Sequence, residues 1–150
     1  MTIQTSNTSD TAEIPRLSVI VPAYNEEENI VPLAEEIIAA LNNLPGGFEL
    51  ILVDDASTDA TKRTIEQFKH DKVRAVFHRI NCGQSAAVGS GFHAARGEWV
   101  ATLDGDGQND PADLPAVDQP DQLLPPAARL QAQHRRRAAA GAADRFPVGD

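Results

Sequence analysis

Short apolar runs alternate along this chain with segments in which apolar residues recur every three or four positions. A short apolar run predicts a buried strand, and the three-and-four spacing predicts a helix with one buried face. The pattern predicts strand, helix, strand, helix, strand, helix, strand: Leu17–Val21, a helix from Asn25 that ends before Pro45, Phe48–Val53, a helix carrying Ile65 and Phe68 inward, Val73–Phe77, Gln84–Ala95 and Glu98–Leu103.

Signals at the ends of these segments refine the prediction. Pro22 is expected to stop the first strand. Glu26–Glu28 are expected in the first turn of the first helix, where acidic residues complement the helix dipole. Ser57 and Asp59 can cap the second helix. Strict alternation of strands and helices predicts an α/β fold, in which a mostly parallel sheet has helices on both faces and binds ligands at the carboxyl ends of its strands.

Polar residues gather in the four loops that follow the predicted strands, and these loops are expected to meet at one edge of the sheet. The candidate residues are Pro22, Tyr24, Asn25 and Glu26, then Asp54, Asp55, Ser57 and Asp59, then Asn81, Cys82, Gly83 and Gln84, and finally Asp104, Asp106 and Gln108. For Ser57 and Asp59, ordinary helix capping and turn formation explain the pattern as well as a binding role does.

Two of these loops suggest contacts to a base or a ribose. Asp54 and Asp55 end an apolar strand, where a carboxylate can accept hydrogen bonds from a base or from ribose hydroxyls, and the alternative is a surface acidic pair. Tyr24 is the only tyrosine. Its ring could lie against a base, or it could serve packing alone.

The loop Asp104–Gln108 places two carboxylates one residue apart directly after an apolar strand. Two carboxylates ~4 Å apart repel by roughly 4 kcal/mol at an effective dielectric constant near 20, which a divalent cation would relieve. An EF-hand does not fit, because its sixth and twelfth positions would be Asn109 and Pro115 instead of Gly and Glu. A phosphoaspartate phosphatase is a minor alternative, since its acidic pair typically follows the first strand. The loop therefore predicts a divalent metal that also holds a phosphate.

Composition narrows the class of protein. The chain has 150 residues, 41% of them hydrophobic, which suits one domain with a core. A formal charge of −9 argues against nucleic-acid binding. A single cysteine, a polar N-terminal segment without a signal-peptide pattern, and no apolar run of membrane-spanning length predict a cytoplasmic protein that is soluble or peripheral to a membrane.

The other candidate motifs give little evidence of function. No metal-ligand spacing links the four histidines, His70, His78, His93 and His134. Cys82 has no evident histidine or cationic partner and is expected to be structural. Gly89–Gly91 fall inside a predicted helix, so they are not a dinucleotide-binding fingerprint. No phosphate-binding glycine-rich loop that ends in Lys and Ser or Thr is present.

The composition changes near Ala116. Residues 117–150 contain no Ile, Lys, Glu, Ser, Thr, Asn, Trp or Tyr. Residues 1–115 hold 8 basic and 18 acidic side chains, whereas the remainder holds 5 and 4. One interpretation is a flexible low-complexity tail. The other is a reading frame lost just after Pro115 in a GC-rich gene.

Three stretches resemble the family-two inverting glycosyltransferases of GT-A fold, and most of all the dolichyl- and polyprenyl-phosphate sugar synthases. They are Leu17-Ser-Val-Ile-Val-Pro-Ala-Tyr-Asn-Glu26, Leu52-Val-Asp-Asp-Ala-Ser-Thr-Asp59 and Asp104-Gly-Asp-Gly-Gln-Asn-Asp-Pro111. The resemblance spans about Arg16–Pro115. It implies a Rossmann-like GT-A domain that binds a UDP- or GDP-linked sugar, uses Mg²⁺ or Mn²⁺, and transfers the sugar to polyprenyl phosphate at the cytoplasmic membrane face.

The resemblance also assigns roles by position. Nucleotide-binding roles fall on Pro22, Tyr24, Glu26, Val53, Asp55, Asn81, Gln84 and Asp104. The catalytic positions are Asp104 and Asp106, and the metal ligands are Asp106 and Gln108.

The implied domain organisation is a disordered tail over residues 1–15, a truncated donor-binding half over 16–116, and the altered segment 117–150. Acceptor-site residues are not identifiable after Ala116. A domain that binds a nucleoside diphosphate without catalysis is therefore the alternative to an active transferase. A nucleotidyltransferase fits less well, because the loop Pro22–Glu28 is acidic where such enzymes carry Gly and Arg or Lys.

Overall fold

A computed structural model describes residues 13–106 together with Pro111 and Leu114. Its elements are β1 (Leu17–Ala23), α1 (Ile30–Leu41), β2 (Phe48–Asp54), α2 (Thr61–Gln67), β3 (Val73–Phe77), α3 (Gln84–Ala94) and β4 (Trp99–Thr102). The predicted alternation of strands and helices is confirmed. The predictions for Gln108, for residues 1–12 and for residues 117–150 lie outside the described residues.

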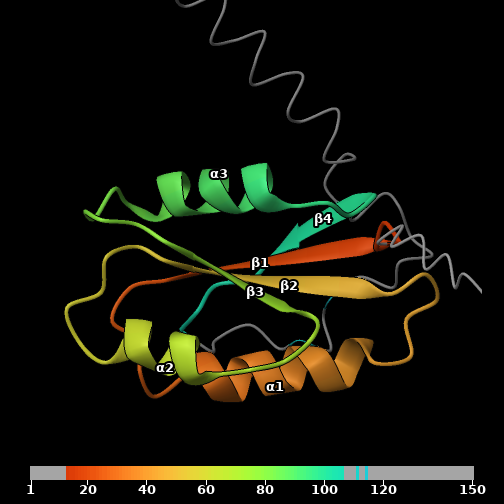
Figure 1. Ribbon diagram of the computed structural model, residues 1–150, viewed down its shortest axis with the longest axis horizontal. Coiled ribbons are helices and arrows are strands. Elements are labelled where there is room, and N and C mark those ends of the chain that lie inside the picture. Colours follow the sequence, from red (N-terminus) through yellow and green to blue (C-terminus); the bar gives the residue numbers. More distant parts are fainter. Residues whose placement is uncertain (1–12, 107–110, 112–113, 115–150) are drawn as a thin grey trace, which may run out of the picture.

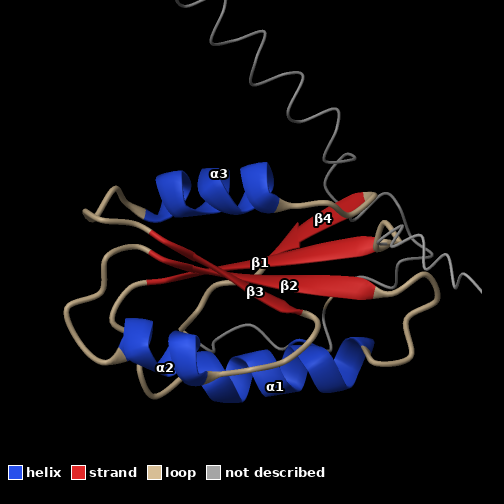
Figure 2. Ribbon diagram, in the orientation of Figure 1, coloured by secondary structure: helices blue, strands red, loops and turns tan. Residues whose placement is uncertain are grey.

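The described strands form one parallel sheet in the order β3-β2-β1-β4. Helix α3 covers one face, and α1 and α2 cover the other (Figures 1 and 2). The prediction of a parallel sheet with helices on both faces is therefore confirmed. Because all strands run the same way, their carboxyl ends lie at one edge, as the ligand-binding rule for such sheets requires.

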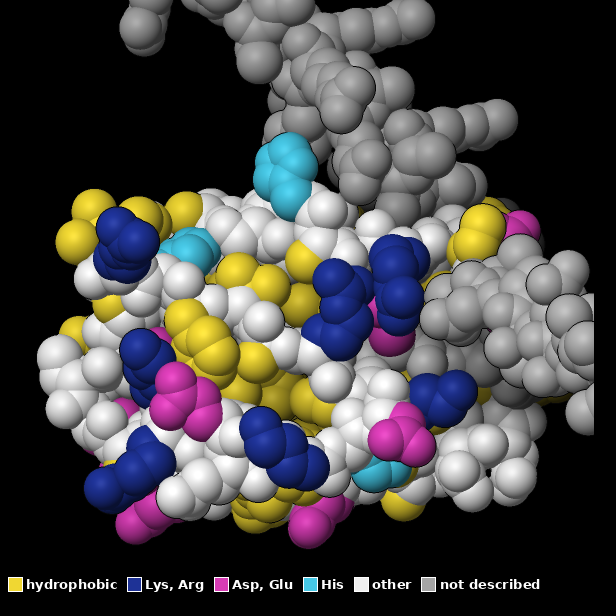
Figure 3. Space-filling view, in the orientation of Figure 1, with side chains coloured by type: hydrophobic (Ala, Val, Ile, Leu, Met, Phe, Trp, Pro, Cys, Tyr) yellow, Lys and Arg dark blue, Asp and Glu magenta, His cyan; other side chains and the backbone are white. Residues whose placement is uncertain are grey.

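The two faces of the sheet divide the core. Alternate residues of a strand point to opposite faces, so the β1 residues Val19 and Val21 pack with α1 while Ile20 packs against α3. Every residue of β1 and of β2 is buried, as in strands enclosed on both faces. The edge strand β3 is less buried. Figure 3 shows apolar side chains in the middle of the visible face, flanked by charges of both signs.

The prediction that Pro22 ends the first strand is wrong, because β1 continues to Ala23. The carbonyl of Ile20 accepts the Leu103 N–H at 3.0 Å, so the backbone groups of Ile20 point toward β4. Pro22 lies two residues later in the same strand, and its backbone groups therefore point to the same side. The last β1–β4 pair is Ile20 with Thr102. The missing N–H of Pro22 therefore falls beyond the paired part of β4 and costs no ladder hydrogen bond.

The acidic residues Glu26–Glu28 lie before α1 instead of in its first turn, which contains no acidic residue. They form a turn in which the Glu26 carbonyl accepts the N–H groups of Asn29 at 3.1 Å and of Ile30 at 3.0 Å. The prediction that they complement the dipole from within the helix is wrong. Their position leaves the Glu26 side chain directed toward the carboxyl edge of the sheet.

A buried carboxylate holds the opposite, amino end of the sheet together. Glu49 is 2% exposed and accepts hydrogen bonds from the Ser18 hydroxyl at 2.7 Å and the Arg96 N–H at 2.6 Å. The guanidinium groups of Arg74 and Arg96 add bonds of 3.0 and 3.1 Å. Burial alone would raise the pKa of Glu49, but these donors, led by Ser18, hold it below its ordinary value. The network ties β1, β2, β3 and the end of α3 to one another.

Helix α3 approaches the sheet through Gly91. A Cβ atom at this position would collide with the Ile20 side chain, whereas a Cβ at Gly89 would meet nothing within 4 Å. Gly91 therefore permits close helix-to-sheet packing. Of the helices in the described part of the chain, none has the length and apolar character needed to cross a bilayer.

We expect Glu49→Ala to lower the free energy of unfolding by about 2–4 kcal/mol, because several buried donors lose their acceptor. The control is Glu98→Ala, since Glu98 is 57% exposed and lies 4.0 Å from Arg16. The control should change stability by less than about 0.5 kcal/mol. Urea unfolding of both variants at neutral pH makes the measurement, and equal losses would contradict the assignment.

The lowered pKa of Glu49 also predicts a pH dependence. A carboxyl whose pKa is lower in the folded state contributes its full stability above its unfolded pKa, and loses that contribution as the pH falls through the folded pKa. The stability difference between the parent chain and Glu49→Ala should therefore shrink between neutral pH and about pH 3. A difference that stays constant over this range would show that the charge of Glu49 is not the stabilising group.

Candidate functional site

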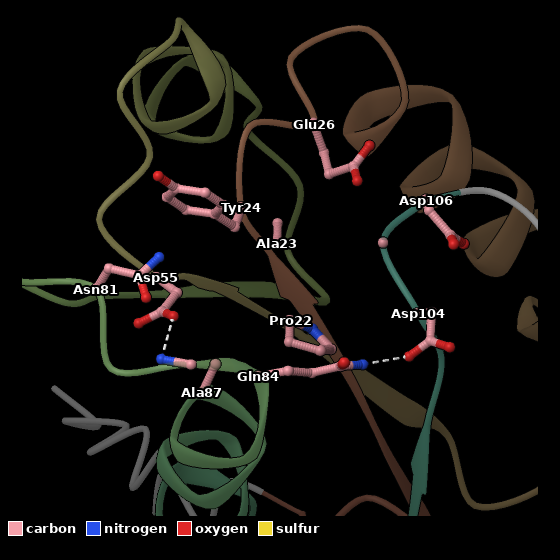
Figure 4. Close-up of a pocket in the computed structure, with 12 residues that line it drawn as sticks. Pro22, Ala23, Tyr24, Glu26, Asp55, Asn81, Gln84, Ala87, Asp104 and Asp106 are labelled. Carbon is pink, nitrogen blue, oxygen red and sulfur yellow. Dashed lines mark hydrogen bonds between the residues drawn. The ribbon is translucent and has the colours of Figure 1, made fainter.

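A cleft of about 410 Å³ opens at the carboxyl edge of the sheet. Residues from all four loops line it, and eight of them were predicted as site residues: Pro22, Tyr24, Glu26, Asp55, Asn81, Gln84, Asp104 and Asp106. Four further residues line the cleft: Gly83 was already among the candidates and Gly105 lies within the predicted Asp104–Gln108 loop, whereas Ala23 and Ala87 were missed. Figure 4 shows Tyr24, Asn81 and Asp55 on one side and Asp104 and Asp106 on the other. The predicted convergence of the loops is thus present in the structure.

Two predicted residues stand apart from this cleft. Val53 is fully buried and packs in the core beneath α3 with Ile20 and Ile51, so its side chain is not offered to a ligand. Gln108 lies outside the described residues. The nucleotide contact expected of Val53 and the metal contact expected of Gln108 remain predictions.

Hydrogen bonds lock the β1–α1 loop to the β2–α2 loop. The side-chain oxygen of Asn25 accepts the Thr58 N–H at 2.8 Å, and the Asn25 N–H donates to the Ser57 hydroxyl at 2.9 Å. The Glu26 N–H donates to the Thr61 hydroxyl at 2.8 Å. Asn25 has a φ of 55°, a conformation that asparagine tolerates better than most residues. These hydrogen bonds fix the backbone of Tyr24 and Glu26, which face the cleft.

Ser57 and Asp59, the two residues predicted to cap α2, have different contacts in the structure. Ser57 accepts from Asn25 and does not cap α2, so that prediction is wrong. Asp59 accepts the N–H of Thr61, the first residue of α2, at 2.9 Å. Burial opposes ionisation of Asp59, but the hydroxyl and N–H of Thr61 and the Glu27 N–H lower its pKa. Neither residue lines the cleft, which favours the turn interpretation for both.

Asp55 joins the end of β2 to the loop before α3. It is 3% exposed, and its carboxylate accepts the Cys82 N–H at 2.9 Å. The carboxylate also accepts the Gly83 N–H at 2.7 Å, a bond that Figure 4 draws. The Nδ1 atom of His78 lies 2.7 Å from the same carboxylate. Burial would raise the pKa of Asp55, but these partners, led by the Cys82 N–H, lower it. Asp55 therefore stays ionised and positions the Asn81–Gln84 loop.

Asp54, the residue before Asp55, is also buried, with 0% exposure. Its Oδ2 accepts the Ser57 N–H at 3.4 Å, and within the described residues its Oδ1 has no hydrogen-bond partner. The surface acidic pair that the sequence left open is therefore wrong, because both carboxylates are enclosed.

The loop after β4 is held from two sides. The Gln84 amide donates to an oxygen of Asp104 at 2.6 Å, a bond that Figure 4 draws across the cleft floor. A Cβ atom at Gly105 would lie 2.6 Å from the Pro22 carbonyl oxygen, so only glycine fits without a shift. This close approach brings the Asp104 and Asp106 side chains beside β1.

The cleft is acidic. Glu26, Asp55, Asp104 and Asp106 are among its lining residues, and none of the described lining residues is Lys or Arg. An anionic ligand in this cleft would therefore need a cation between itself and the carboxylates. Oxygen ligands of this kind suit Mg²⁺ or Mn²⁺, and Asp104, Asp106 and Glu26 are the residues able to offer them.

Comparison with known proteins agrees with this geometry. The family model described as "Glycosyl transferase family 2" matches residues 18–136. The chain is 43% identical over 113 residues to dodecaprenyl-phosphate galacturonate synthase of Rhizobium johnstonii, covering 73% of this chain and 33% of that protein. It is 40% identical over 108 residues to undecaprenyl-phosphate 4-deoxy-4-formamido-L-arabinose transferase of Proteus mirabilis, covering 70% and 33%.

Two solved structures show the same fold. The mannosyltransferase PcManGT from Pyrobaculum calidifontis, in complex with GDP-Man and Mn²⁺, matches with a TM-score of 0.53 and 31% identity over 61% of this chain and 28% of that one. S. aureus TarS 1-349 in complex with UDP-GlcNAc matches with a TM-score of 0.54 and 31% identity over 61% and 26%.

The fold is that of solved glycosyltransferases of GT-A type, and the predicted fold class is confirmed. The chain belongs to glycosyl transferase family 2. It spans about one third of the length of the curated relatives that it matches.

Gly105→Ala should destabilise the protein by about 1–2 kcal/mol, because its methyl group meets a backbone carbonyl instead of a flexible side chain. The matched control is Gly89→Ala, which adds a methyl group in open space on α3 and should stabilise by up to about 1 kcal/mol. Thermal unfolding compares the two. A neutral or stabilising effect of Gly105→Ala would mean that the loop does not need its close contact with Pro22.

Proposed function

We propose that the cleft binds the nucleoside diphosphate of a UDP- or GDP-linked sugar together with Mg²⁺ or Mn²⁺. We propose further that the whole protein transfers the sugar to a polyprenyl phosphate with inversion at the anomeric carbon, at the cytoplasmic face of a membrane. The observation that carries the proposal is an acidic cleft with aromatic and amide groups on one side and a carboxylate pair on the other.

The two sides suit the two ends of a nucleoside diphosphate. The Tyr24 side chain is 45% exposed at the cleft, where its ring can lie against a base. Asn81 stands beside it and can donate to or accept from the base or the ribose. Asp106, with the predicted ligand Gln108, would hold the cation against the diphosphate. Asp104, oriented by Gln84, would face the sugar.

The chemistry of transfer fits these residues. Departure of a nucleoside diphosphate builds negative charge on the leaving oxygen, and a bound divalent cation would stabilise that charge as a Lewis acid. A phosphate oxygen of the acceptor is already nucleophilic, so the protein need not supply a strong base. The chain's own contribution is to hold the donor in line for attack, through contacts on both sides of the cleft.

The comparisons support each part of this proposal to a different degree. The two relatives are named for dodecaprenyl phosphate and undecaprenyl phosphate. One of the solved structures holds UDP-GlcNAc, and the other holds GDP-Man with Mn²⁺. The alternative is a domain that binds a nucleoside diphosphate without transferring a sugar. The one-third coverage of the relatives favours keeping this alternative for the 150-residue chain.

The binding step is tested by calorimetry with UDP and GDP in saturating Mg²⁺. Asp106→Ala should weaken binding of the preferred nucleotide at least about tenfold, since one charge-assisted ligand is worth roughly 1.5–3 kcal/mol. Asp71→Ala is the matched control, because Asp71 is exposed and does not line the cleft. No binding of either nucleotide by the parent chain would reject the proposal.

The base contact is tested by a pair of substitutions at Tyr24. Tyr24→Phe keeps an aromatic face and should retain most of the nucleotide affinity, whereas Tyr24→Ala should lose about 1–3 kcal/mol of binding free energy, the usual value of a base stacked on an aromatic ring. If the two variants bind equally well, the ring of Tyr24 does not lie against the base.

Transfer is tested with the full-length gene product, a polyprenyl phosphate, Mg²⁺ and radiolabelled nucleotide sugars. We expect label to move into the lipid fraction with one of the donors, and to stay in the aqueous fraction for Asp106→Ala. Nucleotide binding without any lipid-linked sugar, across UDP- and GDP-linked donors, would favour the non-catalytic alternative.

A further inference from the structure

Three side chains from three different segments meet on the α3 side of the sheet edge. Asp55 follows β2, His78 follows β3, and Cys82 lies in the loop before α3. A carboxylate oxygen of Asp55, a ring nitrogen of His78 and the Cys82 sulfur all lie within 4.8 Å of one another. Spacing along the chain predicts no metal-ligand role for His78 and no partner for Cys82. The fold supplies both, because β2 and β3 are adjacent strands.

The side chains of His78 and Asp55 are held by several hydrogen bonds, and the Cys82 thiol donates to the Ile80 carbonyl at 3.4 Å. His78 contacts Asp55 through Nδ1, and its Nε2 lies 2.7 Å from the Ser90 hydroxyl of α3. Asp55 also accepts the N–H groups of Cys82 and Gly83. The Ser90 hydroxyl and the N–H groups of Cys82 and Gly83 thus form a second layer around His78 and Asp55, as is typical of protein metal sites.

We propose that Asp55, His78 and Cys82 form a cation site, distinct from the Asp104–Asp106 pair, that takes Zn²⁺. Thiolate, imidazole and carboxylate are the donors that Zn²⁺ prefers, and three protein ligands with one open position are a recurrent zinc arrangement. Mg²⁺ and Mn²⁺ favour oxygen ligands and would leave the sulfur unused. Cys82 is exposed, which provides the path of entry.

Binding of Zn²⁺ would break one hydrogen bond of the cluster and release one proton. The cation takes the place of the His78–Asp55 hydrogen bond, and Asp55 keeps the hydrogen bonds from the Cys82 and Gly83 N–H groups. A neutral His78 binds through Nδ1 and carries its proton on Nε2, which donates to the Ser90 hydroxyl. In either starting tautomer of a neutral His78 the ring keeps its one proton, so only the Cys82 thiol releases a proton to solvent.

The experiment uses the 150-residue chain, stripped of metal by a chelator and free of any affinity tag. Zn²⁺ is titrated by calorimetry, and Co²⁺ serves as a spectroscopic substitute whose absorption reports a thiolate ligand. In a large excess of Mg²⁺, which fills the carboxylate site of the cleft, we expect one Zn²⁺ per chain and a cobalt–thiolate absorption band.

Cys82→Ser is the test variant, because an exposed side chain can be replaced without disturbing the core. It should lower Zn²⁺ affinity at least about tenfold and abolish the cobalt–thiolate band, while thermal unfolding without metal stays unchanged. His93→Ala is the matched control, since His93 is an exposed histidine of α3 outside the cluster, and it should bind Zn²⁺ like the parent chain. Absence of Zn²⁺ binding, an affinity unaffected by Cys82→Ser, or displacement by Mg²⁺ would overturn the proposal.

Discussion

The carboxylate of Asp55 links the end of β2 to the loop that begins α3, and the shape of the cleft depends on that link. Its acceptance of two consecutive backbone N–H groups fixes the loop that carries Asn81 and Gln84. Gln84 in turn contacts Asp104 on the neighbouring loop. A neutral or shorter side chain at Asp55 could not satisfy the two donors in the same way, so one buried charge orders residues on both sides of the cleft.

Carboxylates at the two ends of the sheet have opposite surroundings. At the amino end, Glu49 is matched by Arg74 and Arg96, and its role is to stabilise the fold. At the carboxyl end, the acidic residues that line the cleft have no Lys or Arg among the other described lining residues. The same residue type therefore indicates structure at one end and ligand binding at the other, and the presence of a basic partner distinguishes the two.

Much of the fold was predictable from the sequence because parallel sheets leave few choices. Alternating apolar runs and helical periodicity determine the order of elements, and the topology then brings the loops together at one edge. Tyr24, Asn81 and Asp104 could be assigned to one site for this reason, although they lie far apart in the chain. The family resemblance added the roles that we propose for these residues within the site.

The remaining features depend on contacts that a local pattern does not encode. Pro22 fits inside β1 only because β4 stops pairing two residues earlier, and Ser57 serves a neighbouring loop instead of its own helix. His78 meets Cys82 and Asp55 through strand adjacency, which spacing along the chain does not reveal. The close contact of Gly105 with Pro22 likewise joins residues more than eighty positions apart.

The central claim is that a divalent cation joins the acidic cleft to a nucleoside diphosphate. The most direct test is the affinity of the chain for UDP and GDP, measured by calorimetry across a series of free Mg²⁺ concentrations that starts from chelator alone. The account predicts negligible binding in chelator and an affinity that rises in proportion to Mg²⁺ until the site saturates. Equal affinity with and without the cation would contradict it.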